Sequence, residues 1–211
     1  MPTPTPAATR EPRSDVIRRR LVTITRDVVL LLAVTLLAPF LIVAVLLVDA
    51  LRWVFTRSPF MGIRALAFAW VFLATELVGV LWLFVLWIGA GFGSREVRLV
   101  ASAWQVQTWW ATTLFRAVEF LFGLEVQVTD LDVARPGPIL ALFRHASIVD
   151  NLLPATLLST EAGLHLRWIL KRELLTIPAL DVGGNRLPNY FVDRTSRSPA
   201  AELERIRALA D

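Results

Sequence analysis

Two long apolar runs constrain this chain more than any other feature of its sequence. Residues 28–48 form an uninterrupted apolar run, and residues 65–92 form a second one that contains a single charged residue, Glu76. As a helix, about 20 apolar residues cover roughly 30 Å, the thickness of the hydrocarbon core of a bilayer. The chain is 55% hydrophobic with a mean hydropathy of +0.58, which is too apolar for an ordinary soluble domain. We therefore expect a two-helix membrane hairpin over residues 28–92.

Arginine-rich segments flank both apolar runs. Six arginines lie between residues 10 and 26, and Arg95 and Arg98 follow the second run. The sequence pI of about 10.8 would suit any polyanion, but basic residues beside apolar runs are typical of attraction to anionic lipid headgroups. We therefore expect membrane lipids, and no nucleic acid, as partners.

The hairpin leaves its topology open. Its connector, residues 49–64, carries three arginines, which conflicts with a hairpin that spans the bilayer under the positive-inside rule. A hairpin lodged in one leaflet would remove that conflict. Pro39 predicts a kink in the first run, because proline cannot donate the helical hydrogen bond. Glu76 marks a functional site at membrane depth, as in a channel or transporter subunit, or is a protonated or Arg-paired structural acid.

The segments outside the hairpin differ in composition. Residues 1–27 combine a Pro- and Thr-rich tail, which we expect to be disordered, with a basic helical approach. Residues 93–122 place polar side chains at three- and four-residue intervals opposite an apolar face that includes tryptophans. That pattern predicts an amphipathic helix, either at the membrane interface or packed on the following domain.

Residues 123–211 alternate between short apolar runs and helical patterns. The pattern predicts strands at 124–128, 139–143, 166–170 and 190–193, helices at 151–159 and from Ser198, and a loop at 181–188. Such alternation is typical of an α/β sheet. The predicted fold class is therefore a membrane-anchored α/β protein with a two-helix membrane hairpin, an amphipathic linker helix and the first part of an α/β sheet.

The candidate site lies at the expected junction between a strand and a helix, residues 144–150. His145 would end the strand and Asp150 would stand in the first helical turn, so an imidazole–carboxylate pair can form across the bend. In such a pair the imidazole is a general base and the carboxylate orients it. The alternative is a helix cap, in which Ser147 is the N-cap and Asp150 bonds back to its amide.

Three passages together resemble the glycerolipid acyltransferase family, which includes lysophosphatidate and glycerol-phosphate acyltransferases. His145 and Asp150 are similar to the family's H-x-x-x-x-D motif. Residues 170–174, followed by Pro178, are similar to its Lys-x-Glu-Leu segment, and residues 190–194 are similar to its aromatic–aliphatic–x–Arg strand. The passages occur in the family's order over residues 123–211, so the resemblance implies that this segment is a partial acyltransferase domain.

The resemblance implies acyl transfer from acyl-CoA or acyl-carrier protein to a hydroxyl of a lysophospholipid or glycerol-phosphate acceptor, in phospholipid biosynthesis. His145 would be the general base, Asp150 its orienting partner and Arg194 the ligand of the acceptor phosphate; an ion pair of Arg194 with Asp193 or Glu173 is the alternative. No cofactor beyond the acyl thioester co-substrate and no metal is expected, since the chain has two histidines and no cysteine. The implied location is integral in a bacterial inner membrane with the catalytic part cytoplasmic.

Two departures from the family pattern bear on activity. Arg144 stands where the family commonly has Asn, and the family's Glu-Gly-Thr-Arg motif does not follow the Arg194 passage. We therefore expect a truncated chain whose activity depends on sequence beyond Asp211. The alternatives are a catalytically inactive membrane module that binds lipid, and an acyltransferase for a different lipid-linked acceptor.

Overall fold

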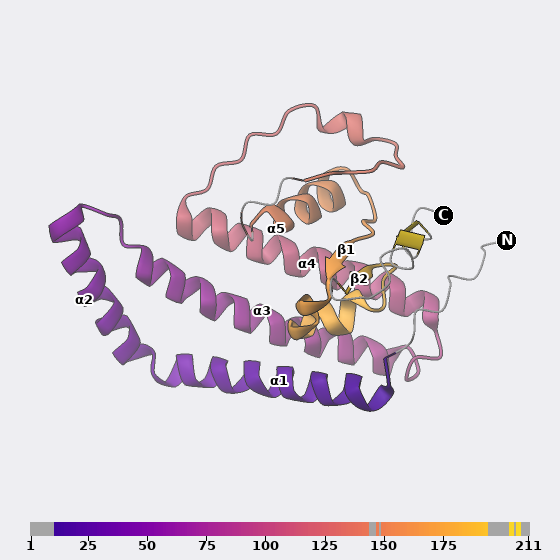
Figure 1. Cartoon of the computed structure of the whole chain (residues 1–211), viewed down its shortest axis with the longest axis horizontal. Coiled ribbons are helices and arrows are strands. Elements are labelled where there is room, and N and C mark those ends of the chain that lie inside the picture. The colour runs from indigo at the N-terminus through magenta and orange to yellow at the C-terminus, as the bar shows by residue number, and fades with distance from the viewer. Residues whose placement is uncertain (1–10, 144–146, 148, 194–202, 205, 208–211) are drawn as a thin grey trace. The chain divides into compact units, whose positions relative to one another are not determined.

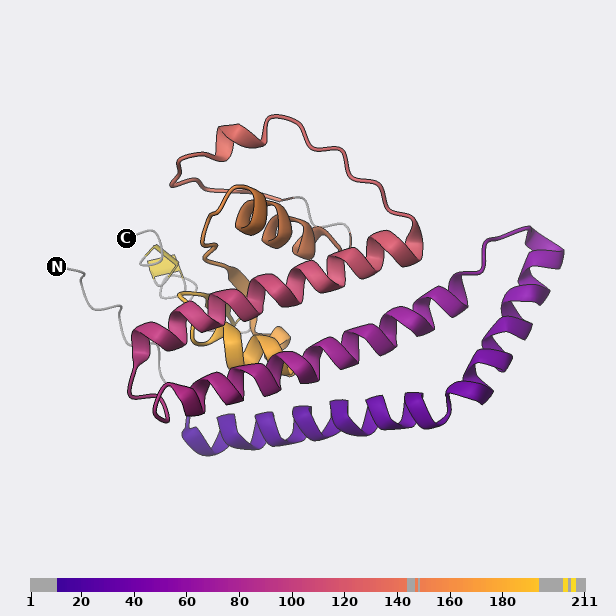
Figure 2. The same cartoon turned by 180° about the vertical axis from the view of Figure 1, so that it is seen from behind.

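The computed structural model describes residues 11–143, 147, 149–193, 203–204 and 206–207 (Figures 1 and 2). Most of these residues are helical, and two short strands form a parallel pair. In chain order the main elements are α1 (Arg13–Leu36), α2 (Ala38–Thr56), α3 (Met61–Gly89), α4 (Glu96–Phe122), α5 (Val149–Thr156), β1 (Ile169–Lys171) and β2 (Tyr190–Val192). Single turns of 3-10 or π-helix, η1 to η4, cover Leu131–Ala134, Leu157–Glu161, Arg172–Thr176 and Leu180–Gly184.

Internal contacts divide the chain into two units. The terminal unit comprises Met1–Thr25, Val80–Gln107 and Leu166–Asp211, and the central unit comprises Arg26–Gly79 and Thr108–His165. The helices α1, α3 and α4 each contribute residues to both units. The terminal unit therefore contains the second and third family-like passages, and the central unit contains the first.

The first apolar run is two helices rather than the one kinked helix that we expected. The chain turns at Leu37, between the end of α1 and the start of α2 (Figure 1), and Pro39 stands in the first turn of α2. A proline is tolerated there because the first helical N–H groups have no partner within their own helix. Since α1 begins at Arg13, the basic approach and the beginning of the apolar run belong to one helix.

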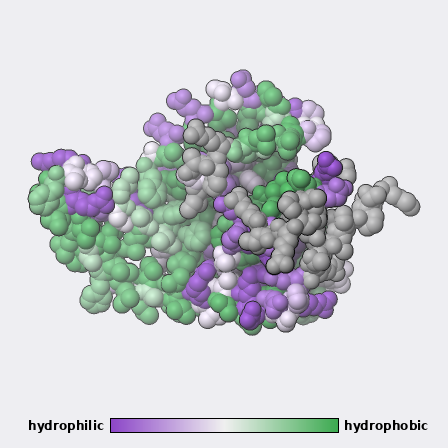
Figure 3. Space-filling view, viewed as in Figure 1, coloured by the Kyte–Doolittle hydropathy of each residue, from purple (hydrophilic) through white to green (hydrophobic). Residues whose placement is uncertain are grey.

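Within the part of the chain that the structure describes, two helices are long and apolar enough to cross a membrane, α2 and α3. The apolar side chains of α2 are largely exposed, and Figure 3 shows them covering this helix, with hydrophilic residues at the end that meets the connector to α3. That connector, residues 57–60, is shorter than the predicted 49–64. Exposed apolar surface on helices of this length suggests membrane association.

The predicted amphipathic helix over residues 93–122 is confirmed as a helix, α4. In the terminal unit its first half packs with the end of α3 and the turn before β2 around a small apolar core of Leu83, Ala103, Val106 and Leu187. Trp82 and Trp104 pack against the edge of this core. The turn that precedes β2 is therefore held in place by apolar contacts with two long helices.

Of the predicted α/β sheet, the described residues contain the strands β1 and β2. Residues 124–128 and 139–143 were expected to be strands, but both run without strand pairing. A strand needs a partner for its ladder, and within the described residues neither segment has one; Pro136 and Pro138 also remove two possible donors beside the second segment.

The other predicted elements of residues 151–207 are found in part. The helix at 151–159 corresponds to α5 and the π turn after it, and the loop at 181–188 begins with a second π turn, η4. The strand at 166–170 is reduced to β1, whereas the strand at 190–193 matches β2. The helix predicted from Ser198 begins outside the described residues, although residues 203–204 and 206–207 are helical.

Candidate functional site

The first family-like passage is described only in part. His145 lies outside the described residues, whereas Ser147 and Asp150 lie within them. Asp150 stands half-buried in the first turn of α5, and its Oδ2 accepts a hydrogen bond of 2.6 Å from the Ser147 backbone N–H. The capping contact predicted from the sequence is therefore confirmed. A carboxylate has two oxygens and about four acceptor positions, so this bond leaves room for an imidazole N–H.

The helix that contains Asp150, α5, is held in place by the burial of one of its faces. Leu152, Pro154, Ala155 and Thr156 are buried, and the Thr156 hydroxyl donates a hydrogen bond of 3.0 Å to the Leu152 carbonyl oxygen. Pro154 cannot donate the helical hydrogen bond toward Asp150, four residues earlier. The passage therefore presents its acid at the start of a short helix that is fixed by apolar packing within the central unit.

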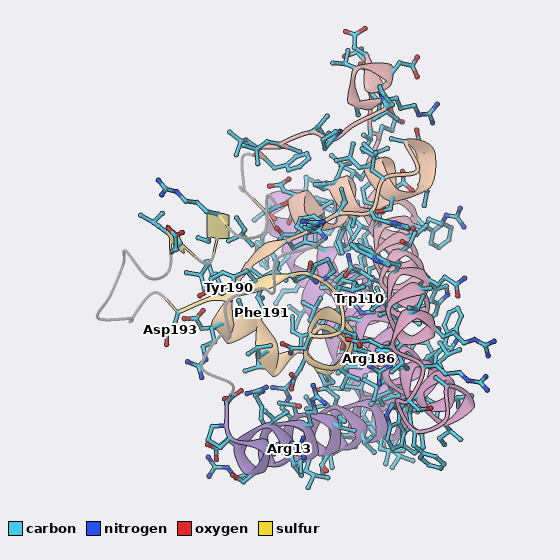
Figure 4. All side chains as sticks on the ribbon, turned by 90° about the vertical axis from the view of Figure 1, so that its right-hand side faces the viewer. Arg13, Trp110, Arg186, Tyr190, Phe191 and Asp193 are labelled. Carbon is cyan, nitrogen blue, oxygen red and sulfur yellow. The ribbon has the colours of Figure 1, made fainter. Side chains whose placement is uncertain are left out.

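The second and third family-like passages lie side by side in the terminal unit. β1 and β2 pair in parallel, with Ile169 opposite Tyr190 and Lys171 opposite Val192. The Asn189 side chain fixes this register, because its Oδ1 accepts a hydrogen bond of 2.9 Å from the Trp168 backbone N–H and its Nδ2 donates one of 3.1 Å to the Gly184 carbonyl oxygen. Figure 4 shows Tyr190, Phe191 and Asp193 following one another along and just beyond β2.

Charged residues just beyond the two strands form ion pairs. Arg172 contacts Asp193 at 2.9 Å and Glu11 at 3.3 Å, and about half of the Arg172 side chain is exposed. Asp193, which we considered as a partner of Arg194, is thus a partner of Arg172. Arg194 lies outside the described residues, and Lys171 and Glu173 are exposed. The structure brings the Lys171 passage and the start of the Arg194 passage together.

Asp181 is the buried charge among the described residues of the terminal unit, and its role was not predicted from the sequence. Its side chain has no exposed surface, and its carboxylate accepts two hydrogen bonds of 3.0 Å from Arg19 and one of 2.9 Å from the Asn185 side chain. Arg20 also contacts it, at 3.3 Å. These bonds with Asp181 are the main reason why the pKa of Arg19 lies above its ordinary value. A lone acid in the apolar passage 179–184 was the signal that could have identified it.

Arg186 stands next to this cluster but pairs differently. It lies on the turn before β2 (Figure 4), and its Nη1 donates a hydrogen bond of 3.1 Å to the carbonyl oxygen of Leu83. Burial lowers the pKa of Arg186, and the positive charge of Arg20 lowers it further. Two like charges therefore lie close together within the terminal unit.

Glu76 has a structural partner in the central unit. The acid has no exposed surface, and its Oε1 accepts a hydrogen bond of 2.6 Å from the indole N–H of Trp110 on α4. This partner is an uncharged donor, and the expectation of a protonated or Arg-paired structural acid stays a prediction. The contact accounts for a buried acid in an apolar helix without a transport pathway.

Comparison with protein-family models, with curated proteins and with solved structures gave no match to this chain. Within the residues that the structure describes, no group of three or more acidic or histidine side chains could hold a metal ion.

Proposed function

We propose that this chain is a membrane-associated acyltransferase of the glycerolipid type. It transfers a fatty acyl group from acyl-CoA or acyl-carrier protein to a hydroxyl of a lysophospholipid or glycerol-phosphate acceptor. The observation that carries the proposal is the parallel pairing of β1 with β2. The pairing sets two passages that resemble one family next to each other, although Leu170 and the residue opposite it, Phe191, are 21 positions apart in the sequence.

In the proposed reaction the His145 imidazole takes the proton of the acceptor hydroxyl as that oxygen attacks the thioester carbonyl. The thiolate of the donor then leaves, and the proton is passed from the imidazole to the leaving sulfur. Asp150 orients the imidazole and stabilises its protonated form. Arg194 grips the acceptor phosphate, since a guanidinium fork matches phosphate oxygens in two hydrogen bonds.

The position of Asp150 supports this role and also supports the main alternative. At the start of α5 the Ser147 backbone N–H fixes the Asp150 carboxylate. A carboxylate fixed in this way can orient a neighbouring imidazole. The same bond is all that a helix cap requires, and it favours an inactive, lipid-binding membrane module as the second candidate function.

Acyl transfer in matched membranes separates the two candidates. Full-length protein is assayed with a labelled acyl thioester and a lysophospholipid, and His145→Ala is compared with the parent. Loss of general-base help predicts a fall in turnover of about 10²- to 10⁴-fold, with membrane insertion unchanged. Asp150→Asn should be less severe. Turnover of His145→Ala equal to that of the parent would exclude the general-base role, and absence of turnover in every form would favour the lipid-binding module.

We propose further that the amino terminus and the acyltransferase segment share the cytoplasmic side of a bacterial inner membrane. The arginines before α2 and in the connector support this placement, because basic segments are retained on that side. Single cysteines introduced at Ser14 and Ser196 should be labelled together in opened cells and in neither case in intact cells. Opposite accessibility of the two sites would contradict the placement.

A further inference from the structure

The carboxylate of Asp181 has its acceptor positions occupied by neighbouring donors. Arg19 binds both oxygens, and the Asn185 amide and the Arg20 guanidinium share Oδ1, at 2.9 and 3.4 Å. Arg20 also donates to the Asp181 backbone carbonyl oxygen at 3.1 Å. One negative charge is thus shared between two guanidinium groups, and Asp181 has little capacity left to neutralise a third.

Arg186 is that third guanidinium, and it has no carboxylate partner among the described residues. Its one hydrogen bond there is to the Leu83 carbonyl oxygen through Nη1, so Nε and Nη2 have no protein acceptor in that part of the chain. The side chain is half-buried, and Arg20 is close enough for its charge to lower the pKa of Arg186. A half-buried cation beside a like charge is unfavourable unless an anion or water compensates it.

Arg20 also has N–H groups that make no hydrogen bond to a described residue. Its hydrogen bonds use Nη2, its Nε makes a 3.3 Å ion contact with Asp181 but no hydrogen bond, and its Nη1 has no acceptor among the described residues. The other carboxylates of the cluster, Glu11 and Asp193, are paired with Arg19 and Arg172. Four arginines therefore stand against three carboxylates, and the excess charge lies at Arg186.

We propose that Arg186, with Arg20, binds a phosphate group. A guanidinium presents planar pairs of N–H donors that fit phosphate oxygens, and a phosphomonoester carries between one and two negative charges at neutral pH. The phosphate can belong to a lipid headgroup or to a soluble phosphomonoester, and the chemistry at the site is the same. The site requires neither His145 nor Asp150, so it goes beyond the proposed acyl transfer.

Two probes separate the sources of phosphate. The full chain in uncharged maltoside micelles is titrated with glycerol 3-phosphate, and in a second arm it is bound to phosphatidylcholine vesicles with and without phosphatidic acid. The ligand-induced rise of the thermal midpoint is the readout in both arms. A response to the soluble probe alone or to phosphatidic acid alone assigns the source, and a response that Arg186→Gln loses supports the site. A response that Arg186→Gln keeps belongs to the phosphate site proposed at Arg194 and overturns this one. No response in either arm overturns it.

Matched variants show whether Arg186 is responsible. Arg186→Gln removes one charge-assisted pair and should weaken phosphate binding roughly ten- to a hundredfold. Arg186→Lys, which keeps the charge but not the fork, should bind with intermediate affinity. Arg98→Gln, which removes an exposed arginine of the same unit, should bind as the parent does. Equal binding by Arg186→Gln and the parent would contradict the proposal.

A measurement on the unaltered protein avoids any folding defect of the variants. Arginine-selective modification with phenylglyoxal, mapped by mass spectrometry, should proceed at Arg186 in the free protein and be suppressed by glycerol 3-phosphate, while Arg98 stays reactive. Unchanged modification of Arg186 at saturating phosphate would overturn the site. His145→Ala should retain the protection, so a failure of acyl transfer and a failure of this site give different results.

Discussion

The buried acids of this protein have two kinds of partner. Asp27 on α1, which is 2% exposed and belongs to the central unit, pairs with the guanidinium of Arg26 at 2.8 Å. In the central unit, Asp49 accepts hydrogen bonds from the backbone N–H groups of Gly62 and Ile63, at 3.1 and 2.9 Å, and Glu76 accepts one from the indole of Trp110. In the terminal unit, Asp181 is held by two guanidiniums and an amide. Backbone and indole N–H groups bind the acids of the apolar helices α2 and α3, whereas guanidinium groups bind the acids on α1 and beside its arginine-rich start.

This difference follows from what each segment can supply. A backbone N–H or an indole N–H adds no charge to an apolar helix, and a charge placed there without a partner would be unfavourable. Among the described residues the terminal unit has arginines in excess of carboxylates, so an ion cluster forms, and the Arg186 guanidinium has no carboxylate partner there. The comparison predicts that variants of Asp181 will respond to salt, and that variants of Asp49 and Glu76 will respond much less.

Removal of the Asp181 carboxylate should have the largest effect on stability. Asp181→Asn leaves Arg20 without a counter-charge among the described residues and leaves Arg19 with Glu11 alone, and we expect a loss of about 3 kcal/mol in the free energy of unfolding. Denaturant unfolding in micelles measures it, with the exposed Glu173→Gln as the control of equal charge change. A loss no greater than that of the control would show that the cluster does not stabilise the unit.

Loss of the Asp49 side chain should rank second. Asp49→Ala leaves the N–H groups of Gly62 and Ile63 unpaired at the start of α3, and we expect a loss of about 2 kcal/mol. Asp49→Asn keeps one acceptor oxygen and should lose less free energy of unfolding. The control is Asp132→Ala, at a side chain that is 98% exposed. The loss caused by Asp49→Ala should hardly change with salt concentration. A strong salt dependence would mean that the acid is paired with a cation after all.

Changes at Glu76 should be smaller and should depend on hydrogen bonding rather than charge. Glu76→Gln keeps an acceptor for the Trp110 indole and should be close to neutral, whereas Glu76→Leu should lose about 1 kcal/mol. Thermal unfolding in micelles and tryptophan fluorescence measure the two variants. Severe destabilisation by Glu76→Gln would indicate that the charge itself matters and would revive the channel or transporter interpretation.

The smallest effect concerns Glu11 and appears as a pH dependence. Its hydrogen bond with Arg19 is the main cause that lowers its pKa below the ordinary value of 4.5. A carboxylate whose folded pKa is lowered stabilises the protein above its unfolded pKa, and this contribution disappears as the pH falls below 4.5 through the folded pKa. The difference in stability between the parent and Glu11→Gln should be up to about 1 kcal/mol at pH 7 and vanish in acid. A difference that grows in acid would contradict the assigned pairing.

Several local features could be predicted from the sequence because they depend on short-range chemistry. The apolar runs, the amphipathic helix over residues 96–122, the cap between Ser147 and Asp150, and the strand at 190–192 follow from hydropathy, periodicity and capping patterns. Pro39 correctly indicated a break near the middle of the first run. None of these features needs a partner that is distant in the sequence, apart from the strand.

The tertiary structure alone decided which of the expected elements find partners. Residues 124–128 and 139–143 have the composition of strands, but a strand exists only where another backbone completes its ladder, and hydropathy does not encode that partner. The role of Asp181 could not be predicted for the same reason. It depends on contacts with Arg19 and Arg20, about 160 positions earlier in the chain, and no local sequence pattern indicates those contacts. Local periodicity thus determined the helices, whereas the ion cluster, the register of β1 with β2 and the contact of the Arg186 guanidinium with the Leu83 carbonyl oxygen arose from long-range contacts.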